Sequence, residues 1–156
     1  MSSIATASSA TNRLSAWLRT LRLLPLLALS FLLAGCPADN VPLEIVGYNH
    51  TDHDIGFFSI NDYGGPYIGK HEGGGKFTCC VLVPTQYKPG MAVSVRWGGL
   101  EMGQTKEQRV EVQPYGPNDF GHFAVHFLRD GSIKVFVTAY YLKHPQYPLK
   151  GDEAKL

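Results

Sequence analysis

Hydrophobic and polar residues alternate along most of the chain after residue 41, which is the pattern of β-strands with one buried face. Val93, Val95 and Trp97, for example, are separated by Ser94 and Arg96. Breaks rich in Gly, Pro, Asn and Asp separate these runs, and no sustained helical period occurs in this region. The pattern predicts seven strands, at Pro42–Tyr48, Ile55–Ile60, Phe77–Val83, Ala92–Trp97, Glu107–Gln113, His122–Leu128 and Ser132–Tyr141.

Many short strands with this spacing predict an all-β fold, a single β-sandwich or small barrel-like domain of about seven strands. The strongest hairpin signal is Arg129–Ser132, where an Asp-Gly pair separates two alternating runs. The polar members of each alternation, and their neighbours such as His122 and His126, are expected on a solvated face. The expected core residues are Ile45, Phe57, Phe77, Val81, Val83, Val93, Val95, Trp97, Val110, Val112, Phe123, Val125, Phe127, Ile133, Val135 and Val137.

Two segments depart from this pattern. Residues 61–76 contain six glycines and one proline, and so long a loop is typical of functional or mobile segments. The C-terminal residues are polar and interrupted by proline, which favours an extended tail that frays near its end.

The first 36 residues have the features of a bacterial lipoprotein leader. Arg13, Arg19 and Arg22 precede the apolar run Leu23–Ala34, which is shorter than the roughly 20 residues that a membrane-spanning helix needs. The run ends in Leu-Leu-Ala-Gly-Cys, which resembles a lipobox with Cys36 as the lipidated residue. Two or three acyl chains would hold the mature protein firmly on a membrane without spanning it.

This interpretation divides the chain into four parts. Residues 1–35 are the signal peptide, 36–41 the lipidated tether, 42–148 the β-rich domain and 149–156 a polar tail. The protein is then expected in the cell envelope, facing the periplasm. The outer membrane is preferred because Pro37, rather than the aspartate linked with inner-membrane retention, follows Cys36.

The charge of the mature region argues against nucleic acid as a partner. Removing the three leader arginines from the 14 Lys and Arg leaves 11 against 13 Asp and Glu, a formal charge of −2. No basic run or stripe accompanies it, which also argues against a polybasic patch for lipid headgroups.

Several motifs suggest chemistry, but none has the context that the chemistry needs. Gly73–Lys76 resembles part of a phosphate-binding loop, but a strand follows it and Phe77 takes the Ser/Thr place. His122 and His126 are four residues apart, about 13 Å on a strand, too far for one metal. The cluster at residues 49–54, Asn-His-Thr-Asp-His-Asp, is best interpreted as a polar turn. With no Gly-x-Ser-x-Gly motif either, we expect no enzyme activity, no cofactor and no metal.

Cys79 and Cys80 are adjacent within a predicted strand, and three interpretations stay open. They form a vicinal disulfide, which is strained because neighbouring Cα atoms lie closer than a disulfide usually allows. They remain thiols, with Cys79 pointing inward and Cys80 outward. Or they bond another chain or a metal. In an oxidising periplasm a structural role is more plausible than redox catalysis, because the Cys-x-x-Cys spacing is absent.

Four blocks of sequence resemble a known family. "VGYNHTDHDIGFFSIN", "GGGKFTCCVLVP", "PGMAVSVRWG" and "HPQYP" are similar to the small bacterial lipoproteins grouped as domain-of-unknown-function 3304. The resemblance runs from about residue 41 to about residue 148. It implies an association with type VI secretion loci, and a role as the immunity protein of a phospholipase effector.

The leading hypothesis is therefore a membrane-anchored binding protein that neutralises a phospholipase effector. The alternative hypothesis is a structural envelope lipoprotein that assembles with secretion or envelope components. A partner-binding patch needs aromatic anchors in exposed loops. The candidates chosen on their loop positions are Tyr63, Tyr67, His71, Tyr115 and Phe120.

Overall fold

The computed structural model describes residues 39–99 and 105–156. The predicted leader and the first half of the predicted tether, residues 36–38 with Cys36, lie outside the described residues. The described residues form eight strands, with the bounds β1 Asn40–Asn49, β2 Phe57–Ile60, β3 Tyr63–Gly64, β4 Glu72–Pro84, β5 Ala92–Gly98, β6 Thr105–Glu111, β7 His122–Phe127 and β8 Ile133–Thr138. Two short 3-10 helices complete the fold, η1 at Pro117–Asp119 and η2 at Gly151–Ala154. Across the described ranges, no helix is long and apolar enough to cross a membrane.

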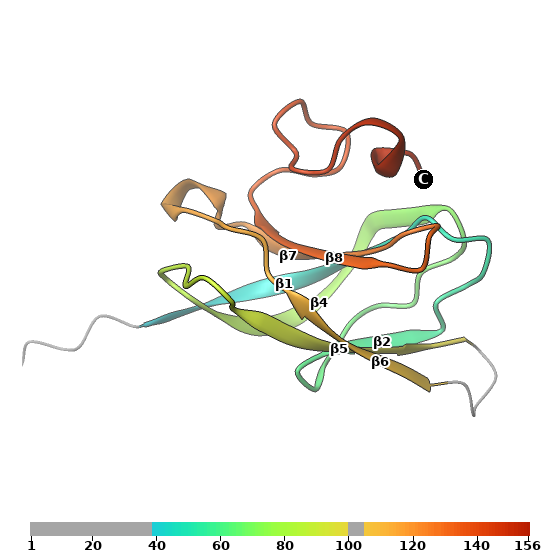
Figure 1. The fold of residues 1–156 in the computed structure, drawn as a ribbon, viewed down its shortest axis with the longest axis horizontal. Helices are drawn as coiled ribbons and strands as arrows, with labels where there is room; N and C mark the ends of the chain where they lie inside the picture. Colours follow the sequence, from blue (N-terminus) through green and yellow to red (C-terminus); the bar gives the residue numbers. More distant parts are fainter. Residues whose placement is uncertain (1–38, 100–104) are drawn as a thin grey trace, which may run out of the picture. The chain divides into compact units, whose positions relative to one another are not determined.

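The strands form two four-stranded sheets that pack as a sandwich (Figure 1). The first sheet has the order β4-β1-β7-β8 and the second has the order β3-β2-β5-β6. All neighbours are antiparallel except β1 and β7, which are parallel from Glu44 opposite His122 to Asn49 opposite Phe127. The predicted all-β sandwich is confirmed, and the described strands do not close into a barrel. All seven predicted strands are present, and β3 is an additional short one.

The predicted hairpin at Arg129–Ser132 joins β7 to β8. Gly131 has a φ of +83°, which a residue without a Cβ adopts at little cost. The Leu128 N–H donates to the Ser132 carbonyl at 2.9 Å, and the Asp130 carboxylate accepts from the Ser132 N–H at 2.9 Å. An Asp-Gly pair therefore makes the turn that its sequence predicts.

The core between the sheets consists largely of the predicted residues, because the period of two sends alternate side chains inward. Phe57 and Phe77 are exceptions, with 43% and 61% of their surfaces exposed. In β2 the inward residues are Phe58 and Ile60, so the prediction chose the wrong one of two adjacent phenylalanines.

The outward position of Phe77 has its origin in a β-bulge. Leu43 pairs with Val81 but Ile45 pairs with Thr78, so two residues of β4, Cys79 and Cys80, lie opposite one residue of β1. In a strand, alternate side chains point to the same face, so one extra residue exchanges the inward and outward positions on the far side of the bulge. Phe77 therefore points outward.

Much of the outer face of the first sheet, over β7, β8 and the second half of β1, is buried, contrary to the expectation of a solvated face. The segment after β8 folds back over β1, β7 and β8, as the red part of the chain in Figure 1 shows. Tyr147 and Leu149 are 0% and 3% exposed, and they pack against Val46, Ala124 and Phe136 in a second hydrophobic cluster. The expectation of an extended, frayed tail is therefore wrong. His122 and His126, expected in solvent, are buried beneath this cover.

A glycine at the start of β4 lets two backbones approach closely. A Cβ on Gly73 would lie 2.6 Å from the Cα of Tyr48 and 2.7 Å from the Gly47 carbonyl oxygen, and backbone atoms cannot easily yield. We expect Gly73→Ala to lower the free energy of unfolding by about 1–3 kcal/mol, the usual cost of overpacking. Chemical denaturation of the purified protein measures this. Gly75→Ala is the matched control, because a Cβ there meets nothing within 4 Å, and a cost equal to that of Gly73→Ala would contradict the argument.

Candidate functional site

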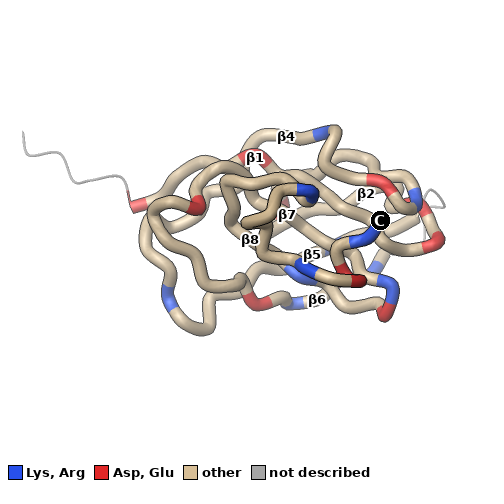
Figure 2. The backbone as a smooth tube through the Cα atoms, turned by 90° about the horizontal axis from the view of Figure 1, so that it is seen from above, with Lys and Arg blue, Asp and Glu red and all other residues tan. Residues whose placement is uncertain are grey.

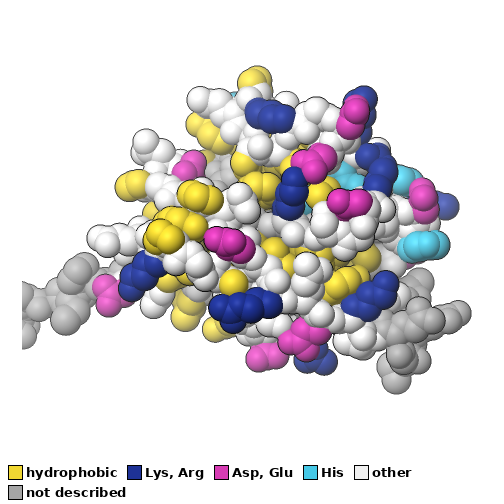
Figure 3. Space-filling model, viewed as in Figure 1, with side chains coloured by type: hydrophobic (Ala, Val, Ile, Leu, Met, Phe, Trp, Pro, Cys, Tyr) yellow, Lys and Arg dark blue, Asp and Glu magenta, His cyan; other side chains and the backbone are white. Residues whose placement is uncertain are grey.

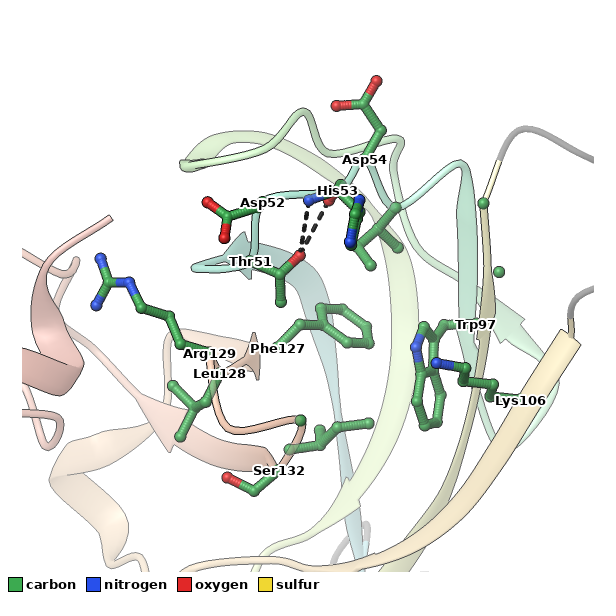
Figure 4. A pocket seen from close by; sticks show the side chains of 15 residues that line it. Thr51, Asp52, His53, Asp54, Trp97, Lys106, Phe127, Leu128, Arg129 and Ser132 are labelled. Carbon is green, nitrogen blue, oxygen red and sulfur yellow. Dashed lines mark hydrogen bonds between the residues drawn. The ribbon is translucent and has the colours of Figure 1, made fainter.

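A cleft opens between the sheets where β1, β5 and β7 end. We call this the distal end of the sandwich, and the end where β1 begins the proximal end. The cleft has a volume of about 390 Å³. Its floor is apolar, and the rings of Trp97 and Phe127 lie there with centroids 5.9 Å apart (Figure 4). Its rim carries charges of both signs, including Asp52, Lys106 and Arg129.

The rim begins with the polar turn after β1, which the buried side chain of Asn49 holds in place. The Asn49 amide donates to the carbonyl oxygens of His53 at 2.7 Å and Gly69 at 3.1 Å. Its own oxygen accepts from the Thr51 N–H at 3.0 Å. Asn49 thus fixes both the turn and the glycine-rich loop, which lies 20 residues further along the chain. The cluster at residues 49–54 is a polar turn, as its sequence predicts.

The carboxylates of this turn bind residues of the glycine-rich loop. Asp54 accepts from the Tyr67 hydroxyl and from the Lys70 N–H, both at 2.9 Å. These two donors, the Lys70 amide first, hold the pKa of Asp54 below its usual value. Asp52 lies 2.9 Å from the Nε2 atom of His71. Both oxygens of Asp54 already have donors. In the described part of the chain no group of three or more His, Cys, Asp or Glu side chains is placed to hold a metal ion.

A chain of buried hydrogen bonds fastens the C-terminal segment next to the cleft. His50 Nδ1 lies 2.7 Å from the Lys155 carbonyl oxygen, and His50 Nε2 lies 2.9 Å from His126 Nδ1. His126 Nε2 lies 2.6 Å from the Tyr147 hydroxyl. A carbonyl only accepts, so His50 Nδ1 carries the proton. With both rings neutral, His126 Nδ1 must then donate to His50, and Tyr147 must donate to His126.

Burial keeps this chain neutral. It lowers the pKa of His50 and lowers that of His126 well below the usual value, and the neighbouring charges of His50, His122 and Lys134 add to the effect at His126. Burial also raises the pKa of the Tyr147 hydroxyl. The hydrogen bonds therefore all donate in one direction, from Tyr147 to Lys155, and every nitrogen of the His50 and His126 rings has a partner. The arrangement is a structural clamp, and both histidines are closed off from solvent.

The five predicted partner-binding residues do not form one surface. Tyr67 and His71 lie at the distal end, against the polar turn, and Tyr63 is exposed on β3. Tyr115 and Phe120 lie towards the proximal end. Tyr115 is only 8% exposed, its hydroxyl donates to the Pro84 carbonyl at 2.7 Å, and Phe120 packs edge-on against its ring. The choice of Tyr115 as an exposed anchor is therefore wrong, and Phe120 is half-buried beside it, because this loop folds back on the core.

Cys79 and Cys80 are joined by a disulfide at the bulge of β4. Cys79 is exposed and Cys80 is half-buried, so Cys79 does not point inward between the sheets. Cys36, the predicted lipidation residue, lies outside the described residues.

No motif in the sequence indicates the cleft directly. Trp97 and Phe127 were expected only as core residues, and Lys106 and Arg129 were not selected. They lie near the ends of different strands, and a single strand's pattern does not indicate which strand ends meet. One signal could have indicated the cleft. The polar turn and the Asp-Gly hairpin each follow a predicted strand, and Trp97 ends one.

The comparisons with known proteins return one match. The family described as "Protein of unknown function (DUF3304)" matches residues 48–135, which is more than half of the chain. No curated protein and no solved structure matches.

Proposed function

The chain belongs to the DUF3304 family, and we propose that it is a binding protein, anchored through Cys36 in the cell envelope, which neutralises a phospholipase effector of a type VI secretion system. The observation that carries the binding role is the distal cleft, with its aromatic floor and mixed charged rim. Such a composition suits a protein partner that inserts an apolar side chain and surrounds it with polar contacts.

The position of the cleft also supports this role. β1 runs from the proximal end to the turn at the cleft, and its ten residues span about 30 Å. A tether before Asn40 would hold the opposite end of the sandwich at the membrane. The cleft would then be presented to a partner that arrives beside the same membrane.

The surface around the cleft extends the area available to a partner. Tyr67 is 40% exposed, and it is held over Asp54 by its hydroxyl and lies beneath the Lys76 ammonium, 5.2 Å from the ring centre. A tyrosine held in one position loses little conformational freedom on binding, which makes it a suitable anchor. Tyr67 and His71 therefore stay in the proposal as partner-binding residues, together with the cleft.

The direct test is protection of a sensitive host. The phospholipase encoded beside this gene is directed to the periplasm, with and without the full-length lipoprotein, and the purified pair is assayed for phospholipase activity. Rescue of growth with stoichiometric inhibition is the expected result. Failure of both rescue and binding would contradict neutralisation and favour the structural envelope role.

Substitutions in the cleft should weaken the complex with that effector. We expect Trp97→Ala to raise Kd by at least about 30-fold, the effect of losing an aromatic anchor worth about 2 kcal/mol. Lys106→Glu should mainly slow association, because rim charges act on the encounter. Surface-based binding measurements give both quantities.

The matched control for Lys106→Glu is Arg109→Glu. Both residues are exposed on β6, but Lys106 pairs with Trp97 at the cleft whereas Arg109 pairs with Ser94 on the opposite face of the sheet. Thermal denaturation of each variant checks that the fold is intact. Equal effects of the two charge reversals would place the interface elsewhere.

A further inference from the structure

The two ends of the sandwich differ in charge. Charged side chains gather at the distal end, among them Asp52, Asp54, Lys70, Lys106, Arg129 and Asp130. In the described residues the loops of the proximal end carry few charged side chains, chiefly Asp39, Lys88 and Asp119. Figure 2 shows the same asymmetry along the backbone tube, with few coloured positions at the end where β1 begins.

Two of the large exposed apolar side chains, Leu82 and Tyr141, lie at the proximal end. Leu82 is 55% exposed and lies opposite Pro42, also exposed, where β4 pairs with β1. Its neighbours Val81 and Val83 point inward, so Leu82 and Pro42 share the outer face of the sheet. Tyr141 is 52% exposed and stacks on His122, with ring centres 4.6 Å apart. Figure 3 shows hydrophobic side chains gathered towards this end of the molecule.

The predicted tether is short. Three residues separate Cys36 from Asn40, so their Cα atoms can be at most about 14 Å apart. A lipid at Cys36 would therefore keep Pro42 and Leu82 within reach of the membrane surface. An exposed leucine next to a lipid surface gains free energy by entering it, and a tyrosine favours the interface between headgroups and acyl chains.

We propose that the proximal end, through Leu82, Pro42 and Tyr141, rests on the lipid surface and orients the sandwich with its distal cleft pointing away from the membrane. This inference rests on the lipidation of Cys36 in the proposed function, but not on any effector. Lys88 is exposed in the proximal loop between β4 and β5, where its charge can pair with a lipid phosphate. The occupant of this surface is lipid, because the lipidated tether holds the surface within about 14 Å of the membrane.

The test uses the full chain, purified from the envelope and reconstituted in vesicles of phosphatidylethanolamine and phosphatidylglycerol, with or without brominated acyl chains. Brominated chains quench tryptophan fluorescence only at close range. Trp97, in the distal cleft, is the internal reference in the parent protein. Leu82→Trp adds a reporter at the proximal end, and Lys106→Trp adds a matched reporter at the distal end.

We expect the emission added by Leu82→Trp to be blue-shifted and largely lost in brominated vesicles, while the parent and Lys106→Trp lose little. Tyr141→Trp reports on the same surface if Leu82→Trp does not fold. The proposal would be overturned if brominated lipid quenched Leu82→Trp and Tyr141→Trp no more than it quenches Lys106→Trp. An intact mass that shows no acyl chains on the protein would also overturn it. Because no effector is present, quenching as expected together with failed protection would overturn the proposed function alone.

Discussion

Replacing Tyr147 by alanine is expected to lower the free energy of unfolding by about 3–5 kcal/mol, the range for deleting a large buried aromatic side chain. Tyr147 is fully buried between the outer face of the first sheet and the C-terminal segment. It packs on Phe136 and Tyr48, and it is the first donor of the hydrogen-bond chain through His126. Its loss removes both the packing and the clamp, and denaturation monitored by circular dichroism measures the effect.

Two further variants separate these contributions. Tyr147→Phe keeps the ring and leaves the Nε2 atom of His126 without its donor, so we expect a loss of about 1–3 kcal/mol. Tyr63→Ala is the control, because that ring is 40% exposed and its removal should change stability by no more than about 0.5 kcal/mol. If Tyr147→Ala proved as mild as Tyr63→Ala, the C-terminal segment would not be part of the cooperative fold.

Acidification from pH 7 to pH 5 is expected to destabilise the protein by about 2–4 kcal/mol. Burial lowers the pKa of His50, His122 and His126 below their usual value of 6.5, and that of His126 furthest. Below about pH 6.5 the unfolded chain therefore binds protons that the folded protein does not. Stability is retained above this pH and is lost as the pH falls towards the folded-state pKa values, by up to about 1.4 kcal/mol per histidine and pH unit.

Burial decides the direction of the pKa shift at each of these histidines. At His50 burial outweighs the hydrogen bond to the Lys155 carbonyl and the charge of Glu153, which both favour protonation, and Arg129 and His71 oppose protonation. Around His126 the charges of His50, His122 and Lys134 all oppose its protonation. The pKa values of Asp54 and Asp130 are lowered from 3.8, so their contributions are lost only at more acidic pH and do not enter this window.

Urea denaturation at several pH values between 7.5 and 5 measures the slope. His126→Gln should reduce the slope, even though it lowers stability at pH 7, whereas His53→Gln, at an exposed position, should leave it unchanged. If the free energy of unfolding does not vary over this pH range, the expectation is contradicted, because His50 and His126 would then accept protons in the folded protein at no cost in stability.

Much of the fold could be predicted because strand patterns are local. Val93 and Val95 on β5, or Val135 and Val137 on β8, point inward because successive side chains alternate, whichever strand lies beside them. The Asp-Gly turn between β7 and β8 is local for the same reason. Where two candidates were adjacent, as with Phe57 and Phe58, the composition of the strand did not decide which one pointed inward.

The candidate site was predictable only in part. The loop positions of Tyr67 and His71 correctly indicated solvent access, but the same criterion failed for Tyr115, whose hydroxyl reaches the Pro84 carbonyl 31 residues away. The polar turn at residues 49–54 was identified. Its joining to the glycine-rich loop through Asn49 and Asp54 was not, because those contacts span 13 to 20 residues.

The sequence by itself determined the class of fold, most strands and the inward residues of the strands without irregularities, since these depend on a period of two within each strand. The tertiary structure alone decided three features. The bulge at Cys79 and Cys80 turned Phe77 outward, the C-terminal segment buried His122 and His126, and the ends of separate strands met to form the cleft. Each depends on which distant segments pack together, and that is settled by the free energy of burying surfaces that no local pattern specifies.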